Sequence, residues 1–255
     1  MDRFIVSERR SLTLAPVELS PKSRSKVKSC VRAIELLGIE DSELFLRYKV
    51  QHFRDSAVEK AALFQSVLGG TLSTQQAAFL GEACNLPYHR DARSSVEYGV
   101  DLALGWLIED AVAHRLKRAG AKVSLTGHDR EREYLLAHEI SQEPDLRITW
   151  LGAERRVEVM CDWLDTWRTR DHLDLRDRKF ARLQVEGALL FGIAPGSASG
   201  LVLAAAAESG AFKFNSSITG YGGKPGFTAH GVSARLLPID DAVELLLGAI
   251  AKNSA

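Results

Sequence analysis

Apolar positions divide the chain into a helical first part and a second part in which helices and strands alternate. In residues 1–93 the apolar residues recur at helical intervals, and Gly or Pro separates the segments from one another. Helices are predicted at residues 21–38, 42–53, 56–70 and 73–87. Ser20 and Pro21 suit the start of the first helix, and Gly38 suits its end. Residues 1–93 are therefore predicted to form a helical N-terminal subdomain.

The pattern from residue 94 predicts an α/β domain that extends to residue 255. A long helix is expected over residues 94–120, with Ser95 as its cap and Gly120 as its end. A short strand follows at once. After a polar stretch, two adjacent strands joined by a short turn cover residues 143–163, and a charged turn leads into the next helix. This helix–strand–strand–strand–helix order predicts a mixed central β-sheet flanked by helices.

The last part of the chain holds one ambiguous segment and one Gly-rich segment. Residues 200–208 suit a strand or a buried helix, because a short apolar run does not separate the two. Residues 214–231 are polar, rich in Gly and Ser and too long for an ordinary hairpin turn. Since long loops in compact domains are often functional, we expect a recognition loop there. A strand at residues 232–239 and a closing helix at residues 240–252 complete the prediction.

The composition is that of an ordinary globular protein, with 45% hydrophobic and 26% charged residues. The chain contains no run of about 18 apolar residues, so no membrane span is predicted. Residues 1–14 lack the apolar centre of a secretion signal. The three cysteines Cys30, Cys84 and Cys161 are widely spaced and form neither a disulfide framework nor a zinc motif. A reducing cytoplasm is the expected location.

The charges of the chain balance, with 33 basic and 33 acidic residues. This balance disfavours a protein that coats nucleic acid without specificity, but it permits a local basic patch. Five cations without an acid among them lie in the first predicted helix: Lys22, Arg24, Lys26, Lys28 and Arg32. Because cations are unfavourable near a helix N-terminus, we expect either a contact with a phosphate backbone or a solvated basic surface there.

Two adjacent strands carry the residues that suggest chemistry. Asp145 follows Pro144 directly in the first strand, and Glu158 lies in the second. Side chains alternate along a strand, so Glu158, Met160 and Asp162 share one face while the opposite face is apolar. Carboxylates from neighbouring strands suit Mg²⁺, which takes oxygen ligands and usually one or two protein carboxylates.

The preceding helix contributes a third carboxylate. Glu109 interrupts an otherwise apolar stripe at helical spacing, formed by Gly105, Val112 and Leu116. Gly105 would let the helix approach the sheet closely, so that Glu109 points over its edge toward Asp145. The alternative is a surface glutamate at the rim of the core.

In order and spacing, these features resemble the core of the PD-(D/E)XK nuclease superfamily. That core has a helix with a Glu, a strand beginning Pro-Asp, a strand with Glu-x-Lys and a further helix. The matching segments lie within residues 94–193 and read GWLIEDAVAHRL, EPDLRI, RVEVM and LRDRKFARLQ. The resemblance implies a restriction-endonuclease-like fold and metal-dependent hydrolysis of phosphodiester bonds. It also implies Mg²⁺, with Mn²⁺ as a substitute, held by Asp145 and Glu158 with Glu109 as an outer or second ligand.

The chain departs from the family pattern at Met160, which stands where the family has its Lys. A thioether carries no charge, so another group would have to supply it. Lys179 on the following helix is the best candidate, and Lys122 on the preceding strand is the second. Alternatively, Asp162 enlarges the carboxylate cluster. A further alternative is that the domain is catalytically inactive, either in its natural form or because a Lys at position 160 was deliberately substituted.

The resemblance favours a type II restriction enzyme, a sequence-specific, Mg²⁺-dependent endonuclease for double-stranded DNA. Cutting both strands favours a homodimer, and readout would come from loops or helices in the major groove. Tyr221 and Lys224 in the Gly-rich segment are candidate DNA contacts. Three tryptophans near the strand ends could stack on bases or close the edge of the core: Trp150, Trp163 and Trp167. Two other classes stay open, a RecB-like repair or end-processing nuclease and an inactive DNA-binding module on a degenerate nuclease core.

Overall fold

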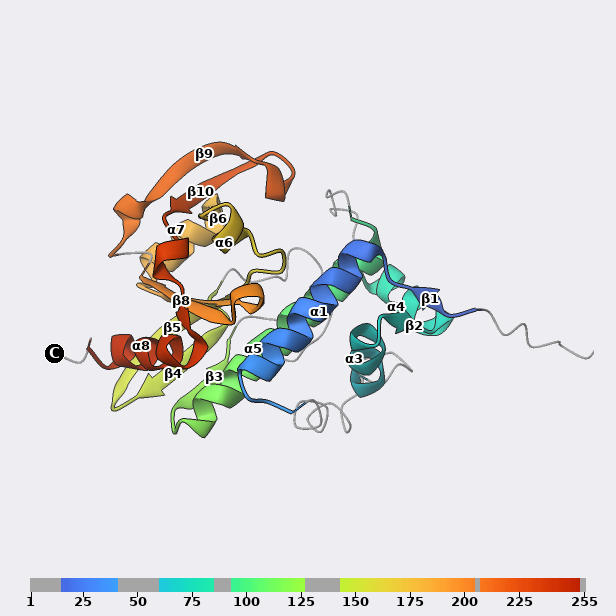
Figure 1. Cartoon of the computed structure of the whole chain (residues 1–255), viewed down its shortest axis with the longest axis horizontal. Helices are drawn as coiled ribbons and strands as arrows, with labels where there is room; N and C mark the ends of the chain where they lie inside the picture. The colour runs from blue at the N-terminus through green and yellow to red at the C-terminus, as the bar shows by residue number, and fades with distance from the viewer. Residues whose placement is uncertain (1–14, 41–59, 85–92, 127–142, 205–206, 253–255) are drawn as a thin grey trace, which may run out of the picture.

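A six-stranded mixed β-sheet forms the centre of the second part of the chain (Figure 1). The computed structural model describes residues 15–40, 60–84, 93–126, 143–204 and 207–252. The strands of this sheet are β3 (Lys122–Leu125), β4 (Leu146–Trp150), β5 (Ala153–Cys161), β7 (Leu189–Ala194), β8 (Ser199–Ala204) and β11 (Leu237–Pro238). Their order is β11-β8-β7-β5-β4-β3, in which β5 and β7 run parallel and all other neighbours antiparallel. The predicted α/β class with a mixed central sheet is confirmed.

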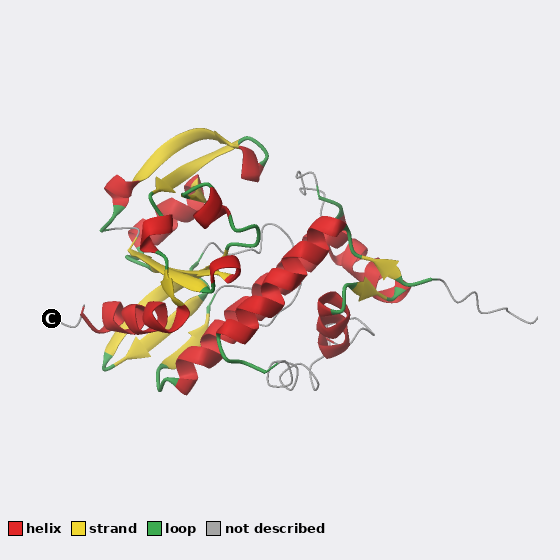
Figure 2. Cartoon of the chain, viewed as in Figure 1, coloured by secondary structure: helices red, strands yellow, loops and turns green. Residues whose placement is uncertain are grey.

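Helices lie against this sheet (Figure 2), and an apolar core covers each of its two faces. On one face, α5 (Ser95–Arg118) and α8 (Ile239–Ala251) share a core with Val157 of β5. On the other face, α7 (Asp177–Val185) places Phe180 in a second core with Leu190 of β7. Met160 packs against this second core. The side chains of β5 therefore alternate between the two faces, as the expected strand period requires.

A second, three-stranded antiparallel sheet lies beside α7. Its strands β6 (His172–Arg176), β9 (Phe212–Ile218) and β10 (Lys224–His230) stand in the order β6-β10-β9. The prediction of a loop at residues 214–231 was wrong, because most of this segment forms a β-hairpin with a 3₁₀ turn at Thr219–Tyr221. The charged turn predicted before α7 likewise contains β6. Phe227 holds the hairpin to α7 by stacking on Phe180 at a centroid distance of 4.2 Å.

The described N-terminal residues are mainly helical, as predicted. They form α1 (Pro21–Leu36), α3 (Lys60–Leu68) and α4 (Thr74–Cys84), with a small pairing of β1 (Val17–Glu18) and β2 (Thr71–Leu72). The helix predicted at residues 42–53 and most of the polar stretch before β4 lie outside the described residues. Side chains of α1 such as Val27 and Ile34 belong to the same core as α5 and the central sheet. The first part of the chain is thus packed directly onto the second.

The ends of α5 follow from local sequence. Ser94, and not Ser95 as predicted, caps the helix, because Ser94 and Glu97 form a reciprocal capping box. The ambiguous segment at residues 200–208 contains strand β8, and α8 confirms the predicted closing helix. The strand predicted at residues 232–239 shrinks to the two residues of β11 after a 3₁₀ turn. No helix among the described residues is long and apolar enough to cross a bilayer.

Candidate active site

The strand register brings Asp145 and Glu158 together. β4 and β5 pair as far as Leu146 opposite Val157, and one further antiparallel step places Asp145 opposite Glu158 on the same face. Pro144 has no N–H, so the ladder ends there. β5 continues beyond this point and pairs with β7 instead. The two carboxylates therefore lie where β4 separates from β5.

Local hydrogen bonds fix the end of β4. The Val159 N–H, which has no β4 partner, donates to Asp145 Oδ2 at 2.8 Å. The Thr126 N–H donates to the Asp145 carbonyl at 2.9 Å, and the Thr126 hydroxyl donates to the Pro144 carbonyl. The position of the Asp145 carboxylate is thus set by backbone on both sides of β4.

Glu158 is the buried centre of the site. Its relative exposure is 6%, and Lys179 Nζ reaches it from α7 at 2.6 Å from Oε2. The Lys179 ammonium group is therefore the partner of Oε2, which is itself buried. A buried carboxylate is costly for the fold unless an opposite charge compensates it, and Lys179 supplies that charge.

Electrostatics links four residues, which we call the acid–lysine cluster: Glu109, Asp145, Glu158 and Lys179. Burial raises the pKa of Glu158 well above its ordinary value, and Asp145 raises it further against the opposing effect of Lys179. Burial alone would lower the pKa of Lys179, but Glu158 and Asp145 outweigh it and raise that pKa. Glu109 acts on both groups in the same direction as Asp145, which places it within electrostatic reach. Lys179 therefore remains an ammonium group.

The structure does not bring Asp162 or Lys122 to this cluster. The carboxylate of Asp162 accepts hydrogen bonds from the Thr166 and Trp167 N–H groups at the start of α6 (Thr166–Thr169). Asp162 also lies four residues beyond Glu158, which corresponds to about 13 Å along an extended strand. Lys122 is exposed and pairs with Thr149, at the end of β4 opposite to Asp145. Of the candidates for the missing charge, only Lys179 is in place.

The cluster suits a hard divalent cation by its donor chemistry. It offers three carboxylate side chains against one ammonium group. No group of three or more His, Cys, Asp or Glu stands in metal-binding geometry within the described ranges. The carboxylates would therefore have to draw closer as an ion binds. Oxygen ligands of this kind fit Mg²⁺ and Mn²⁺.

A cleft of about 770 Å³ lies beside the cluster, between α1 and α5 on one side and the second sheet on the other. Met160, two residues beyond Glu158 on the same face of β5, lines it. Tyr221 also lines it, and the Tyr221 hydroxyl donates to the Asp174 carbonyl at 2.7 Å. Burial raises the pKa of Tyr221 to about 12, with smaller effects of Glu158 and Lys179 that place the ring near the cluster.

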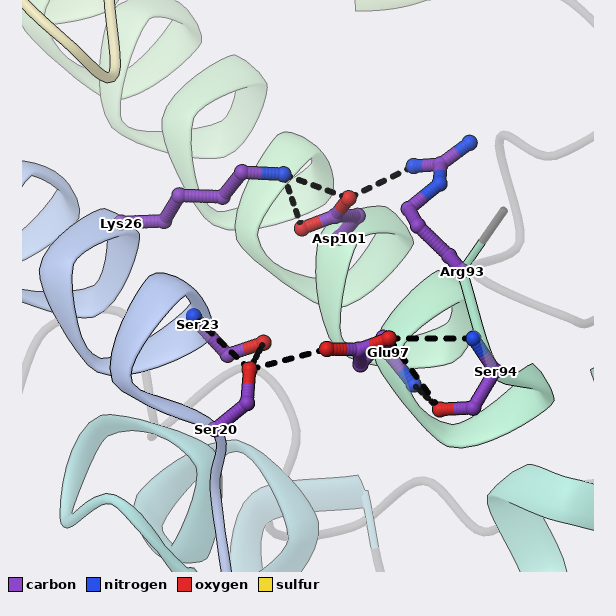
Figure 3. A network of polar contacts seen from close by, with 7 residues as sticks. All are labelled: Ser20, Ser23, Lys26, Arg93, Ser94, Glu97 and Asp101. Carbon is purple, nitrogen blue, oxygen red and sulfur yellow. Dashed lines mark hydrogen bonds and ion pairs between the residues drawn. The ribbon is translucent and has the colours of Figure 1, made fainter. Parts of the chain in front are cut away.

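Polar contacts between α1 and α5 build one wall of this cleft (Figure 3). Asp101 of α5 accepts hydrogen bonds from Lys26 Nζ at 2.6 Å and from an Arg93 nitrogen at 2.6 Å. Ser20 donates to Glu97 at 2.9 Å, which ties the cap of α1 to the cap of α5. Asp101 balances one of its two cationic partners, and Glu97 adds a second negative charge to the same set of contacts. No local sequence pattern predicts that these residues pair, because they come from distant segments.

The predicted DNA contacts are placed differently from one another. Lys22 and Lys26 line the cleft, whereas Arg24 pairs with Glu18 at 2.9 Å and Lys28 is exposed on α1. Lys224 is exposed at the start of β10. None of these placements by itself tests a contact with DNA.

The three tryptophans also differ. Trp167 is 3% exposed and packs on Gly192, where a Cβ atom would lie 2.5 Å from its ring. Trp150 packs beside Gly120. Trp163 and Trp167 both line the cleft, and Trp163 is the more exposed of the two.

Comparison with known proteins gives no independent assignment. No family model matches this sequence, and none of the curated proteins is similar to it. The site itself has to carry any functional conclusion.

Proposed function

We propose that this protein is a metal-dependent deoxyribonuclease that hydrolyses phosphodiester bonds at the acid–lysine cluster. One observation carries the proposal: carboxylates on α5, β4 and β5 meet a lysine from α7 around a buried glutamate whose pKa is raised. Perturbed ionisable groups gathered in this way are typical of functional sites. The succession of α5, β3, β4, β5, α7 and β7, with α6 and β6 inserted before α7, supports the resemblance to the PD-(D/E)XK core.

The chemistry divides between an ion and the residues of the chain. Asp145 and Glu158 would hold Mg²⁺, or Mn²⁺ in its place, with Glu109 as a further ligand. A bound divalent ion supplies positive charge to the scissile phosphate and lowers the pKa of its water. Lys179 stays protonated, so it donates hydrogen bonds and offsets phosphate charge instead of accepting a proton. The Val159 N–H holds the Asp145 carboxylate in a fixed orientation.

The first form of this proposal is a cytoplasmic, homodimeric restriction enzyme that cuts double-stranded DNA at a specific sequence. A nuclease that processes ends or flaps is the second form. The cleft beside the cluster has the volume of a pocket for a small ligand, which favours the second form. Both forms share the same chemistry at the cluster.

Incubation of the purified protein with mixed plasmid DNA and Mg²⁺, followed by sequencing of the product ends, tests the proposal. Discrete ends at one sequence support the restriction form, and scattered ends support the end-processing form. Asp145→Ala and Glu158→Ala should abolish cleavage and leave DNA binding largely intact.

Glu244→Gln is the matched control, because Glu244 is an exposed glutamate on α8. It should cleave as the unsubstituted protein does. Cleavage that survives Asp145→Ala or Glu158→Ala would remove the assignment of the site. DNA binding without cleavage in either Mg²⁺ or Mn²⁺ would instead support an inactive DNA-binding module.

A further inference from the structure

The second sheet has one apolar and one polar face. Leu173, Leu175, Phe212 and Ala229 belong to the core that also contains Phe180 of α7. The residues that alternate with them line the cleft: His172, Asp174, Asn215, Ser217, Thr228 and His230. The strand register places Thr228 between Asp174 and Lys213, and His230 opposite His172, so these side chains share one face. No described element packs over this polar face.

Short polar groups on that face are available to a ligand. β9 is an edge strand, and its residues 213–217 are exposed on both sides. Asn215 Oδ1 accepts a hydrogen bond from the Ser217 N–H at 3.0 Å, which leaves the Asn215 amide nitrogen as a donor toward the cleft. Amide and hydroxyl groups can bond to both phosphates and base edges.

The charges of the cleft favour an anion. Its three carboxylates already have partners: Asp101 binds Lys26 and Arg93, Asp162 caps α6, and Asp174 accepts from Thr228 at 2.7 Å. Lys22 and Arg170 line the same cleft and make no ion pair with another described residue. The β9–β10 hairpin, residues 212–230, contains two lysines and no acidic residue.

The dimensions of the cleft limit what can enter it. A volume of about 770 Å³ lies within the range of roughly 300–1,000 Å³ for pockets that enclose one small ligand. Lys22 and Arg93 on one wall and Asn215 on the other line the same cavity, so the walls face each other across this small space. A DNA duplex needs a broad open surface, with roughly 1,000–2,500 Å² of protein buried. A cleft of this volume suits one unpaired strand better than a duplex.

The cleft comes close to the acid–lysine cluster, although none of the four cluster residues lines it. Met160 lines it from the face of β5 that carries Glu158, and Tyr221 lines it beside the cluster. Trp163, which directly follows the residue that caps α6, offers a partly exposed aromatic ring to the same space. Aromatic rings in basic grooves stack on the bases of single strands.

We propose that this cleft binds an unpaired DNA strand and leads it to the cluster, with its phosphates on the α1–α5 wall and its bases against Trp163 and the polar sheet face. This inference rests on the proposed nuclease function. It makes a strand end, flap or unpaired region the preferred substrate over continuous duplex.

Fluorescence anisotropy of the full chain without metal ion measures this preference without cleavage. The probes are a labelled thymidine strand of about 12 nucleotides, within the roughly 4–16 nucleotides that single-strand sites cover, and a duplex of equal length. The strand should bind at least about tenfold more tightly. Trp163→Leu should weaken strand binding about tenfold through lost stacking. Lys22→Gln should reduce the slope of log affinity against log salt by about 0.7, the value for one phosphate contact in a single strand.

Trp150→Leu and Lys117→Gln are the matched controls, since Trp150 is also half-buried and Lys117 is an exposed lysine on α5 away from the cleft. Both should bind the strand as the unsubstituted protein does. Equal or tighter binding of the duplex overturns the inference, as does an equal effect of the controls. Because Lys22 is exposed, Lys22→Gln remains informative if Trp163→Leu proves unstable.

The two proposals can fail separately. Cleavage of duplex that depends on Glu158, without binding of the single strand, would leave the nuclease proposal intact and remove this one. Tight strand binding through the cleft, without cleavage in Mg²⁺ or Mn²⁺, would do the reverse.

Discussion

Removal of the Lys179 charge is the perturbation with the clearest expected magnitude. Lys179→Met keeps a flexible chain of similar length and deletes the ammonium group 2.6 Å from Glu158 Oε2. At that distance and an effective dielectric constant of about 20, the gross attraction is about 6 kcal/mol. The loss of this attraction is partly offset, because the variant no longer has to desolvate a buried ammonium group. Loss of one partner of a buried ion pair usually costs about 3–5 kcal/mol, and we expect a loss in that range near neutral pH.

Cleavage should fall together with stability but for a separate reason. In the proposed function Lys179 supplies the charge that the resemblance expects at position 160, so its loss should reduce the cleavage rate about 100-fold or more, as for other single electrostatic stabilisers. Denaturant unfolding and plasmid cleavage measure the two effects on the same preparation. Lys252→Met on the exposed end of α8 is the control and should change neither.

A double variant separates folding from chemistry. Lys179→Met combined with Glu158→Gln removes both charges of the pair, so stability should recover while cleavage stays absent. A rate loss of less than about threefold in a folded Lys179→Met protein would refute the reasoning. The missing charge would then have to come from Lys122, or from an arrangement that includes Asp162.

Three further outcomes follow from the same contacts. Glu158→Gln should raise the free energy of unfolding near neutral pH in the absence of metal ion. The pKa of Glu158 is raised in the folded state, so ionisation of Glu158 lowers stability as pH rises through the folded pKa. Lys179 does not lose all its partners in this variant, because other carboxylates remain near it. Thermal unfolding from acid to neutral pH should show this gain shrinking toward acid pH. Met160→Lys restores the family spacing and should return activity to a Lys179→Ala protein, whereas continued inactivity would argue that position 160 does not face the scissile phosphate. Glu97→Gln should cost about 1 kcal/mol near neutral pH through the capping box. The hydrogen bonds from Ser94 and Ser20 lower the pKa of Glu97, so this cost should disappear as pH falls through that lowered pKa, and a cost that does not vary with pH would contradict this origin.

Sequence alone was sufficient where the contacts are local. Asp145 and Glu158 lie on consecutive strands joined by a tight turn, so their order and the strand period predict that they meet. Lys179 could be anticipated because α7 is the first helix of more than one turn after these strands. The helical period of α5 was sufficient to predict that Glu109 faces these strands.

The sequence did not predict the parts of the molecule that depend on distant segments. β9 and β10 were hidden because Gly and Ser interrupt their apolar period, although Phe212, Phe214 and Phe227 follow it. The cleft joins α1 and α5 to the second sheet, and no local pattern indicates which residues will face one another there. The prediction that Asp162 joins the cluster was wrong. Strand alternation predicts on which face of the sheet a side chain lies, but not which groups it contacts, and the Asp162 carboxylate accepts hydrogen bonds from N–H groups at the start of α6.

Metal-dependent cleavage by the unsubstituted protein and its Glu158→Gln variant tests the central claim most directly. Both proteins are incubated with plasmid DNA and a single-stranded oligonucleotide in Mg²⁺, in Mn²⁺ and in chelator. The account predicts cleavage only by the unsubstituted protein and only with a divalent ion, while the folded variant still binds DNA. Equal cleavage by both proteins, or cleavage in chelator, would contradict it.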